Sequence, residues 1–489
     1  MDQRVAGSEV ALLIGGRDMA AATGETFDRL APTTGAVATR AAAASPADAH
    51  AAADSAAEAF PAWSELGPNA RRAILSRAAD GLESLAGAFV TAMREEIGAT
   101  EGWARFNVML AAGMIREAAA LTTQIAGEVI PSDKPGCLAM AIRQPAGVVV
   151  GIAPWNAPVI LGVRAVATPL ACGNTVVLKA SEVCPRTHRL IGDAFRDAGL
   201  PPGVLNVVTN APADAAAVVE ALVAHPAVRR INFTGSTKVG KIIARLGAEH
   251  MKPVLLELGG KSPLIVLDDA DLAEAVKAAA FGAFMNQGQI CMSTERIVVV
   301  DAVADAFVEM FAAKARTLVA GDPLDARTPL GAMVDRAAAA RVQALVDEAV
   351  AKGAQVVAGG AADGVLMSAT VLDHVTADMA IYAEESFGPS VCILRVKDEA
   401  AAIAAANDTD YGLAASVFTR DIARGLKVAR QVQSGICHIN GPTVHDEAQM
   451  PFGGVKASGW GRFGGRAGIA EFTDLRWITV ETQPGHFPI

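Results

Sequence analysis

The stretch NQGQICMSTER, from Asn286 to Arg296, places one cysteine, Cys291, between a polar approach that contains glycine and a polar exit. A cysteine used only for packing is usually surrounded by apolar residues, and here the apolar neighbours are Ile290 and Met292. An activated thiol is a nucleophile that adds to a carbonyl carbon. Packing and nucleophilic catalysis both stay open for this cysteine, because an activating environment must come from other parts of the chain.

Two other side chains suit a reaction at a carbonyl group. Glu257 lies in LLELGGK, an apolar, strand-like run that ends in two glycines. A buried lone carboxyl group has a raised pKa, which suits a general base near neutral pH. Asn156 stands between two prolines in APWNAP, where asparagine is ordinarily a turn former. A glutamate that faces water at the end of a strand is the alternative interpretation of Glu257.

A glycine-containing run, INFTGSTKVGK, places Gly235 and Gly240 between a predicted strand and a predicted helix. Free backbone N–H groups and a helix N-terminus favour a phosphate group there. The run nearly matches the loop of nucleoside triphosphatases, so a P-loop nucleotide-binding protein is one alternative. Ile242, however, occupies the position where that loop needs Ser or Thr to hold magnesium.

The run VVLKASE ends another predicted strand with Lys179 and Glu182. Open α/β folds bind nucleotides at the carboxyl edge of the sheet, where these two residues are expected. An acidic side chain there accepts hydrogen bonds from ribose hydroxyls and repels a 2′-phosphate. The sequence therefore predicts NAD, rather than NADP, as the cofactor; two solvated residues after a strand are the alternative.

The elements that must position these residues follow from hydrophobic spacing. From Ser45 to about Glu117 the chain is rich in alanine, with apolar residues at helical intervals, which predicts helices. From Gly147 short β-branched runs alternate with helical segments, which indicates a parallel, doubly wound sheet. A second alternation begins at SPLIVLDD and predicts a second α/β domain. Two extended pieces, about 127–143 and 471–482, either pair with each other or another subunit, or form ordinary edge strands.

The composition narrows the class of partner. The chain has 489 residues and a formal charge of -10, so a nucleic-acid partner is not expected and a small-molecule substrate is. Its six cysteines form no C-x-x-C pair, which predicts a cytoplasmic protein without a disulfide framework or a metal site. Prolines interrupt the longest uncharged stretch, 145–163, and the start of the chain lacks the layout of a signal peptide, so no membrane association is expected.

Seven motifs in one order resemble those of the aldehyde dehydrogenase superfamily: PWNAP, VVLKASE, FTGSTKVG, LELGGK, NQGQICMS, EESFGP and PFGGVKASGWGR. The segments GATEGWARFNV and INGPTVHDEAQMPFGG are most similar to its aromatic branch, the salicylaldehyde, vanillin and benzaldehyde dehydrogenases. The resemblance implies an α/β fold with a Rossmann-type, doubly wound NAD-binding domain (1–126 and 144–256) and a second α/β catalytic domain (257–469). It also implies a small β bridging unit (127–143 and 470–489) that joins the subunits of a homodimer or homotetramer.

The same resemblance implies a role for individual residues. Cys291 is similar to the nucleophile, Glu257 to the general base, and Asn156 to an oxyanion donor that acts with the backbone N–H of Cys291. The implied cofactor-binding residues are Ile152, Pro154, Trp155, Lys179, Glu182, Phe233, Gly235, Ser236, Gly240, Glu257, Leu258, Gly259, Glu385 and Phe387. The implied substrate-binding residues are Trp103, Ala157, Leu161, Arg164, Met285, Ile290, Met292 and Phe452. No metal ligand is implied.

The small Ala157 and the charged Arg164 depart from the bulky aromatic residues of many relatives. They predict a wide slot with a polar anchor for a flat ring that bears a hydroxyl, methoxy or carboxylate group. The expected reaction is oxidation of an aromatic aldehyde to the acid through a thiohemiacetal and a thioester on Cys291. The alternatives are an aliphatic or semialdehyde dehydrogenase, a cysteine hydrolase that uses His438 or His445, and a structural homologue without activity. Trp103 as a helix-core residue and Arg164 as an ion-paired residue also stay open.

Overall fold

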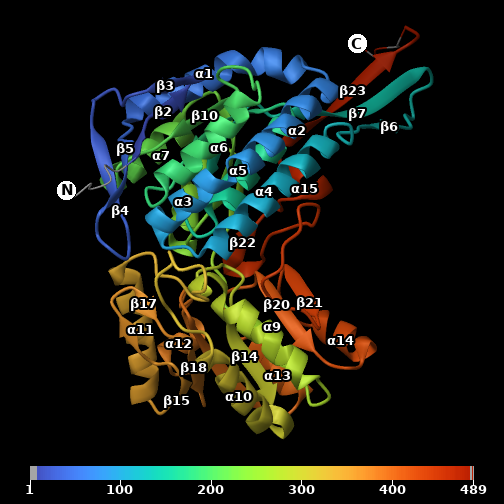
Figure 1. The fold of residues 1–489 in the computed structure, drawn as a ribbon. Coiled ribbons are helices and arrows are strands. Elements are labelled where there is room, and N and C mark those ends of the chain that lie inside the picture. The colour runs from blue at the N-terminus through green and yellow to red at the C-terminus, as the bar shows by residue number, and fades with distance from the viewer. Residues whose placement is uncertain (1–7, 485–486, 488) are drawn as a thin grey trace, which may run out of the picture.

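The computed structural model describes residues 8–484, 487 and 489. Two α/β parts lie one above the other in Figure 1, and a narrow arm of strands projects from the upper part near the C-terminus. The outermost residues of the predicted NAD-binding domain (1–7) and of the predicted bridging segment (485, 486 and 488) lie outside the described residues.

The upper part is built on an eight-stranded sheet with the strand order β22-β12-β11-β8-β9-β10-β2-β3. The strands from β12 to β10 are parallel, and β22, β2 and β3 add antiparallel pairs at the two edges. Central strands of a doubly wound sheet are covered on both faces, and β8 and β9 are accordingly buried throughout and rich in valine. The bounds are β2 (Leu12–Ile14), β3 (Arg17–Met19), β8 (Val148–Ile152), β9 (Thr175–Lys179), β10 (Leu205–Val208), β11 (Val228–Thr234), β12 (Val254–Glu257) and β22 (Gly459–Trp460).

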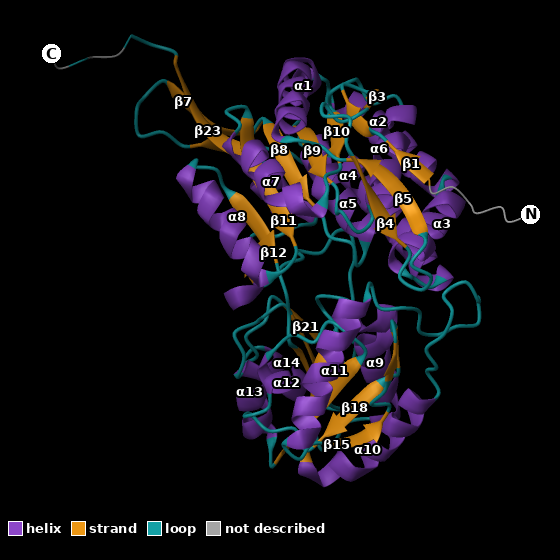
Figure 2. Ribbon diagram, turned by 90° about the vertical axis from the view of Figure 1, so that its left-hand side faces the viewer, coloured by secondary structure: helices purple, strands orange, loops and turns teal. Residues whose placement is uncertain are grey.

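Helices cover both faces of this sheet (Figure 2). One face carries α2 to α6 and the other carries α1, α7 and α8, each group with its own apolar core. The first helix starts at a capping box in which Ser45 and Asp48 satisfy each other's backbone N–H groups. The bounds are α1 (Pro46–Glu65), α2 (Pro68–Ser84), α3 (Ala86–Ile97), α4 (Glu101–Leu121), α5 (Pro158–Ala171), α6 (Pro185–Asp197), α7 (Ala215–Ala224) and α8 (Thr237–Glu249). In the described part of the chain, no helix is both long and apolar enough to cross a membrane.

The lower part is a seven-stranded sheet with the order β15-β18-β19-β14-β13-β20-β21, parallel except for the edge pair of β15 and β18. Helices α9 and α10 pack on one face, and α11 to α14 pack on the other. The strands are β13 (Ser262–Val266), β14 (Thr294–Val300), β15 (Gln355–Ala358), β18 (Thr370–Asp373), β19 (Ser390–Val396), β20 (Ala414–Phe418) and β21 (Ile436–Ile439). The helices are α9 (Leu272–Phe284), α10 (Asp301–Arg316), α11 (Arg336–Ala351), α12 (Ala380–Ala383), α13 (Glu399–Asn407) and α14 (Ile422–Ala429). The predicted doubly wound sheet and second α/β domain are confirmed.

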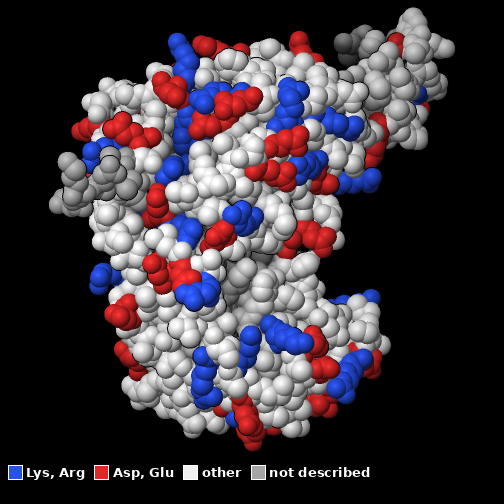
Figure 3. All heavy atoms as spheres, in the orientation of Figure 1, with Lys and Arg blue, Asp and Glu red and all other residues white. Residues whose placement is uncertain are grey.

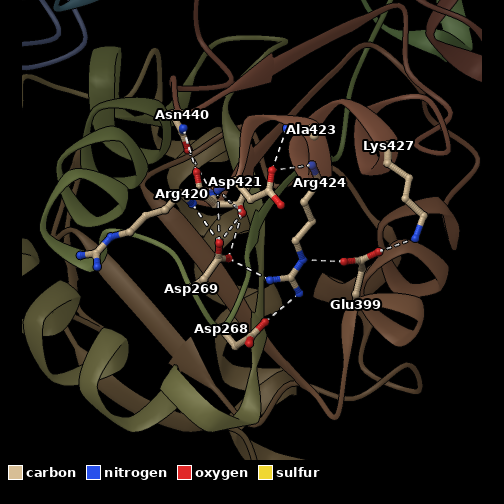
Figure 4. A network of polar contacts seen from close by, with 10 residues as sticks. Asp268, Asp269, Glu399, Arg420, Asp421, Ala423, Arg424, Lys427 and Asn440 are labelled. Carbon is tan, nitrogen blue, oxygen red and sulfur yellow. Dashed lines mark hydrogen bonds and ion pairs between the residues drawn. The ribbon is translucent and has the colours of Figure 1, made fainter.

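An ion network ties α13 and α14 to the loop after β13 (Figure 4). The Arg424 guanidinium contacts Asp268 at 2.7 Å, Asp269 at 2.9 Å and Glu399 at 2.7 Å. These contacts hold three separate segments of the lower part together at its surface.

The projecting arm is an antiparallel sheet of three strands with the order β23-β7-β6. Its strands are β6 (Glu128–Ile130), β7 (Cys137–Pro145) and β23 (Thr473–Glu481), so the two extended pieces predicted from the sequence pair with each other. Small sheets complete the fold: β1 (Ser8–Val10), β4 (Thr26–Leu30) and β5 (Val37–Ala42) form one, and β16 (Ala362–Asp363) and β17 (Leu366–Met367) form another.

Two details differ from the predicted domain boundaries. Strand β7 runs to Pro145, beyond the predicted limit at 143. Trp460 pairs with Leu256, so β22 extends the upper sheet although it lies within the predicted catalytic segment 257–469. The following helix, α15 (Gly465–Glu471), also packs against α4 and α5 of the upper part. The unpaired backbone N–H and C=O groups of a sheet edge can pair with a segment from any part of the chain. Membership of a sheet therefore need not follow the order of the sequence.

Candidate active site

A pocket of about 370 Å³ lies where the two parts meet. The outline of the molecule narrows between the two parts on the right-hand side of the space-filling view (Figure 3). Three successive strands of the upper sheet, β8, β11 and β12, end at the pocket, because the carboxyl ends of parallel strands share one edge. The lining residues are Pro154, Trp155, Asn156, Thr234, Gly235, Ser236, Glu257, Gly259, Cys291, Arg341, Glu385 and Phe387.

A tight turn delivers Cys291 to this pocket. Asn286, Gln287 and Gly288 have positive φ angles of 49°, 56° and 69°, so three consecutive residues adopt the left-handed conformation. A Cβ atom at Gly288 would lie 2.1 Å from the carbonyl oxygen of Gly388, so the turn requires glycine there. Such strain persists only where surrounding contacts hold it, and it is concentrated at functional sites.

The side chain of Asn156 is held in place by the same turn. Its Nδ2 donates a hydrogen bond to the carbonyl oxygen of Gln289 at 3.0 Å. The backbone carbonyl oxygen of Asn156 accepts from Trp103 Nε1 at 3.0 Å and from Asn286 Nδ2 at 2.9 Å. One hydrogen of the Asn156 amide is left for another acceptor in the pocket.

Glu257, the last residue of β12, is buried to 1% exposure beside Cys291. Burial raises the pKa of its carboxyl group to about 7, partly offset by the positive charge of Arg164. Among the described residues, no donor makes a hydrogen bond of acceptable geometry to either carboxylate oxygen, although the Cys291 thiol is near enough to affect it. Burial and the Glu257 carboxylate together raise the pKa of the Cys291 thiol. The pair therefore contains a proton acceptor that works near neutral pH and a thiol that needs one.

Other lining residues of the pocket suit a dinucleotide. Ser236 caps α8 by accepting from the backbone of Val239, so the N-terminus of this helix lies at the pocket. A Cβ atom at Gly240 would lie 2.4 Å from the Leu258 side chain, so glycine allows the helix to pack closely on the strand end. Trp155 and Phe387 meet edge to face with their ring centroids 5.8 Å apart.

A thiol, a carboxyl group with a raised pKa and a helix N-terminus in one pocket agree with a comparison of sequences. The sequence model described as "Aldehyde dehydrogenase family" matches residues 19–478. The chain belongs to the aldehyde dehydrogenase family. It is therefore an enzyme that oxidises an aldehyde with NAD or NADP, as the resemblance implied.

Individual relatives of this aldehyde dehydrogenase are similar over nearly its whole length. It is 60% identical to a vanillin dehydrogenase from Pseudomonas fluorescens, over 98% of this chain and all of that one. It is 51% identical to a salicylaldehyde dehydrogenase from Pseudomonas putida, over 95% of this chain and 96% of that one. The crystal structure of a salicylaldehyde dehydrogenase from Pseudomonas putida G7, complexed with salicylaldehyde, superposes with a TM-score of 0.97 at 50% identity, covering 99% of this chain and 100% of that one. The predicted similarity to the aromatic branch of the family is confirmed.

In this aldehyde dehydrogenase the loop that carries Glu385 and Phe387 is held by a buried ion pair. Lys261 Nζ and Glu295 Oε2 lie 2.5 Å apart, with side chains 0% and 3% exposed. The Glu295 carboxylate also accepts from the backbone N–H groups of Ser386 at 2.8 Å and Phe387 at 3.0 Å. Glu295 thus sets the position of two pocket residues without lining the pocket.

Replacing Glu295 by glutamine should lower the free energy of unfolding by about 3–5 kcal/mol, because Lys261 would keep a buried charge without its partner. Denaturant unfolding measures this loss. Glu274→Gln is the control, since its pair with Lys277 is exposed and should hardly matter. Equal free energies of unfolding for the two variants would mean that the buried Lys261–Glu295 pair does not stabilise the fold.

The predicted adenosine-binding residues lie farther along the sheet edge. Lys179 ends β9 and forms an ion pair with Glu182, and Asn210 Nδ2 donates to Glu182 Oε1 at 3.1 Å. Burial by itself would raise the pKa of Glu182, but the charge of Lys179 and the hydrogen bonds to the carboxylate together outweigh it, and the pKa is lowered. Glu182 is therefore ionised at neutral pH. Four other predicted cofactor residues, namely Ile152, Phe233, Gly240 and Leu258, are buried behind the pocket wall instead of lining it.

The predicted substrate residues are mostly apolar, and the apolar ones belong to or pack against the large core of the upper part that Cys291 also contacts. One apolar cluster contains Trp103, Ala157, Leu161, Ile290, Met292 and Phe452, with Cys291 and the partly buried Met285 packed against it. The Trp103 side chain is 3% exposed, stacks on Phe106 and bonds to the backbone of Asn156, so it also supports that residue.

Arg164 differs from the free polar anchor that the sequence suggested. Its guanidinium forms a buried ion pair with Asp446 and lies over the Phe452 ring, 4.1 Å from the centroid. The ion-paired alternative left open for this residue is the one that the structure shows. Asp446, Glu295 and Arg341 were not predicted as site residues. Asp446 and Glu295 lie in motif segments, and Arg341 lies in helix α11. The sequence contains no spacing pattern that would indicate the partner of any of the three.

Proposed function

We propose that this enzyme oxidises aromatic aldehydes to carboxylic acids with NAD, using Cys291 as the nucleophile, Glu257 as the general base and Asn156 as an oxyanion donor. The observation that carries the proposal is the meeting of a thiol, a carboxyl group with a pKa of about 7 and a fixed side-chain amide in one pocket. The aldehyde dehydrogenase family supplies the reaction class.

The first step is addition of the Cys291 sulfur to the aldehyde carbon. Glu257 accepts the thiol proton, and the new S–C bond turns the carbonyl oxygen into an oxyanion. Asn156 Nδ2 and the backbone N–H of Cys291 donate hydrogen bonds to that oxyanion. NAD, which residues such as Glu182 and Ser236 would hold, would supply the acceptor for the hydride that leaves the same carbon.

The second step is hydrolysis of the thioester that remains on Cys291. Glu257 first releases the thiol proton to solvent and then removes a proton from a water molecule, which attacks the thioester carbon. The C–S bond breaks, the acid leaves, and the thiol is restored. One carboxyl group thus serves both steps, and its raised pKa suits it to both.

The apolar cluster around Cys291 and the names of the relatives support an aromatic substrate. Trp103, Leu161 and Phe452 offer flat or branched apolar surface to a ring. The test is to measure kcat/KM for benzaldehyde, hydroxylated benzaldehydes and straight-chain aldehydes with the purified enzyme. A higher kcat/KM for benzaldehyde than for every straight-chain aldehyde is expected. The reverse order would favour the aliphatic or semialdehyde alternative.

Glu182 supports NAD over NADP. Its ionised carboxylate stands at the sheet edge where the adenosine ribose is expected, and it would repel a 2′-phosphate. Glu182→Ser removes this charge and frees Lys179 to attract the phosphate. We expect the NAD-to-NADP ratio of kcat/KM to fall by about 10-fold or more. Equal kcat/KM with both cofactors in the unmodified enzyme would contradict this assignment.

We also propose the predicted three-unit organisation, in which the arm of β6, β7 and β23 joins two subunits. The arm exposes large apolar side chains, which mark surfaces for association. They are Val129, Ile130, Leu138, Leu475, Trp477 and Val480. A homodimer or homotetramer is expected by sedimentation.

The free cysteines among the described residues support a cytoplasmic location.

A further inference from the structure

We propose that Asp446 binds a hydroxyl group on the ring of the aldehyde substrate, and that Arg164 holds Asp446 in place instead of binding the substrate itself. The inference rests on the proposed oxidation of aromatic aldehydes and names the ring substituent that the site selects.

Asp446 has one occupied and one free carboxylate oxygen. Arg164 Nη2 donates to Oδ2, and the two side chains are 6% and 9% exposed. The other oxygen, Oδ1, is fully buried, and no donor among the described residues reaches it. A buried acceptor without a donor is costly, so a ligand that brings an O–H group gains a charge-assisted hydrogen bond.

The ion pair lies close enough to the reacting groups for its charges to act on them. The charges of Arg164 and Asp446 both affect the pKa of Glu257, and the charge of Arg164 also affects that of the Cys291 thiol. Arg164 lies over the ring of Phe452, which is in the same apolar cluster as Leu161 and Ile290. Asp446 thus lies in a narrow cavity beside Phe452 and Phe463, which it shares with two other carboxylates, Glu117 and Glu447.

The position of the pair along α5 indicates which ring position it meets. Asn156 precedes the helix, whereas Arg164 lies about 9 Å beyond the helix start at Pro158. A ring held with its aldehyde carbon at Cys291 would thus direct its far side toward Asp446. A hydroxyl at the meta or para position should be recognised better than one at the ortho position.

The charges of the Arg164–Asp446 pair also predict which ring substituents bind poorly. Asp446 neutralises Arg164, so an acidic ring substituent gains no net attraction and meets the carboxylate as a like charge. A carboxylate on the ring, one of the groups suggested by Arg164 in the sequence, is therefore disfavoured.

The test compares kcat/KM for 4-hydroxybenzaldehyde, 2-hydroxybenzaldehyde and 4-formylbenzoate, each divided by kcat/KM for benzaldehyde. Dividing by benzaldehyde cancels any general change at Glu257 or Cys291. In Asp446→Leu the 4-hydroxybenzaldehyde ratio should fall by about 10-fold or more, because an acceptor on a charged group is lost. The 4-formylbenzoate ratio should rise, because Arg164 loses its counter-ion.

The double variant Arg164→Met with Asp446→Leu removes both charges and leaves no buried charge unpaired. It provides the same comparison of substrates if the single variant fails to fold. It should also lose the preference for 4-hydroxybenzaldehyde, but without a rise for 4-formylbenzoate. Glu249→Gln is the control: its carboxylate is exposed at the end of α8 and lines neither cavity, and no ratio should change.

An unchanged 4-hydroxybenzaldehyde ratio in folded variants that lack Asp446 would overturn the inference. So would a stronger preference for 2-hydroxybenzaldehyde than for 4-hydroxybenzaldehyde in the unmodified enzyme. Failure of the proposed function is distinct, because it appears in the unmodified enzyme as poor oxidation of benzaldehyde itself relative to straight-chain aldehydes.

Discussion

Replacing Cys291 by alanine is expected to abolish aldehyde-dependent formation of NADH. Without the sulfur no covalent adduct forms, so the substrate carbon never reaches the state from which hydride leaves. The alanine side chain is smaller and the site is only partly buried, so the fold should survive. The absorbance of NADH measures its formation, at an enzyme concentration high enough to detect a small residual activity.

Cys437→Ala is the matched control for this experiment. Cys437 is another partly buried thiol, on β21, and it lies outside the pocket. Its replacement should leave turnover unchanged. Residual steady-state activity of Cys291→Ala near that of Cys437→Ala would assign the nucleophile elsewhere and return Cys291 to a packing role.

Replacing Glu257 by glutamine is expected to slow turnover by about 10²- to 10⁴-fold, the usual loss for a missing general base. The amide keeps the shape of the carboxyl group but cannot take a proton. Thioester hydrolysis should then limit the rate, so rapid mixing should show a burst of up to one NADH per active site. Mass spectrometry of the Cys291 peptide should detect the acyl adduct. If Glu257 also accepts the thiol proton, as proposed, the burst itself is slower than in the unmodified enzyme.

The same residue predicts a pH dependence. A general base acts in its deprotonated form, and burial raises the pKa of Glu257 to about 7. Turnover of the unmodified enzyme should therefore fall as the pH is lowered through about 7, and Glu257→Gln should lack this decline. Glu249→Gln, at an exposed site at the end of α8, should keep the normal rate and pH profile. Normal turnover in a folded Glu257→Gln variant would remove this residue from the mechanism.

The sequence by itself determined the fold class and brought the central residues to attention. Alternation of β-branched runs with helical segments predicts parallel sheets, because each strand must be covered on both faces. Parallel strands place their carboxyl ends at one edge, so Lys179 and Glu182 were expected there. The joint roles of Asn156 and Glu257 were implied only by the family resemblance. The thiol of Cys291 needed a further step, the resemblance of the ordered motifs to one family.

Only the tertiary structure decided how these residues are supported. The indole of Trp103 bonds to the backbone of Asn156, and the Glu295 carboxylate holds the loop of Phe387. Arg164 and Asp446 are 282 positions apart in the chain, yet they form one buried ion pair. Local patterns record which face of an element is apolar, because that depends on neighbours in the sequence. The partner of a buried polar group depends on which distant segments pack together, and no local spacing carries that information.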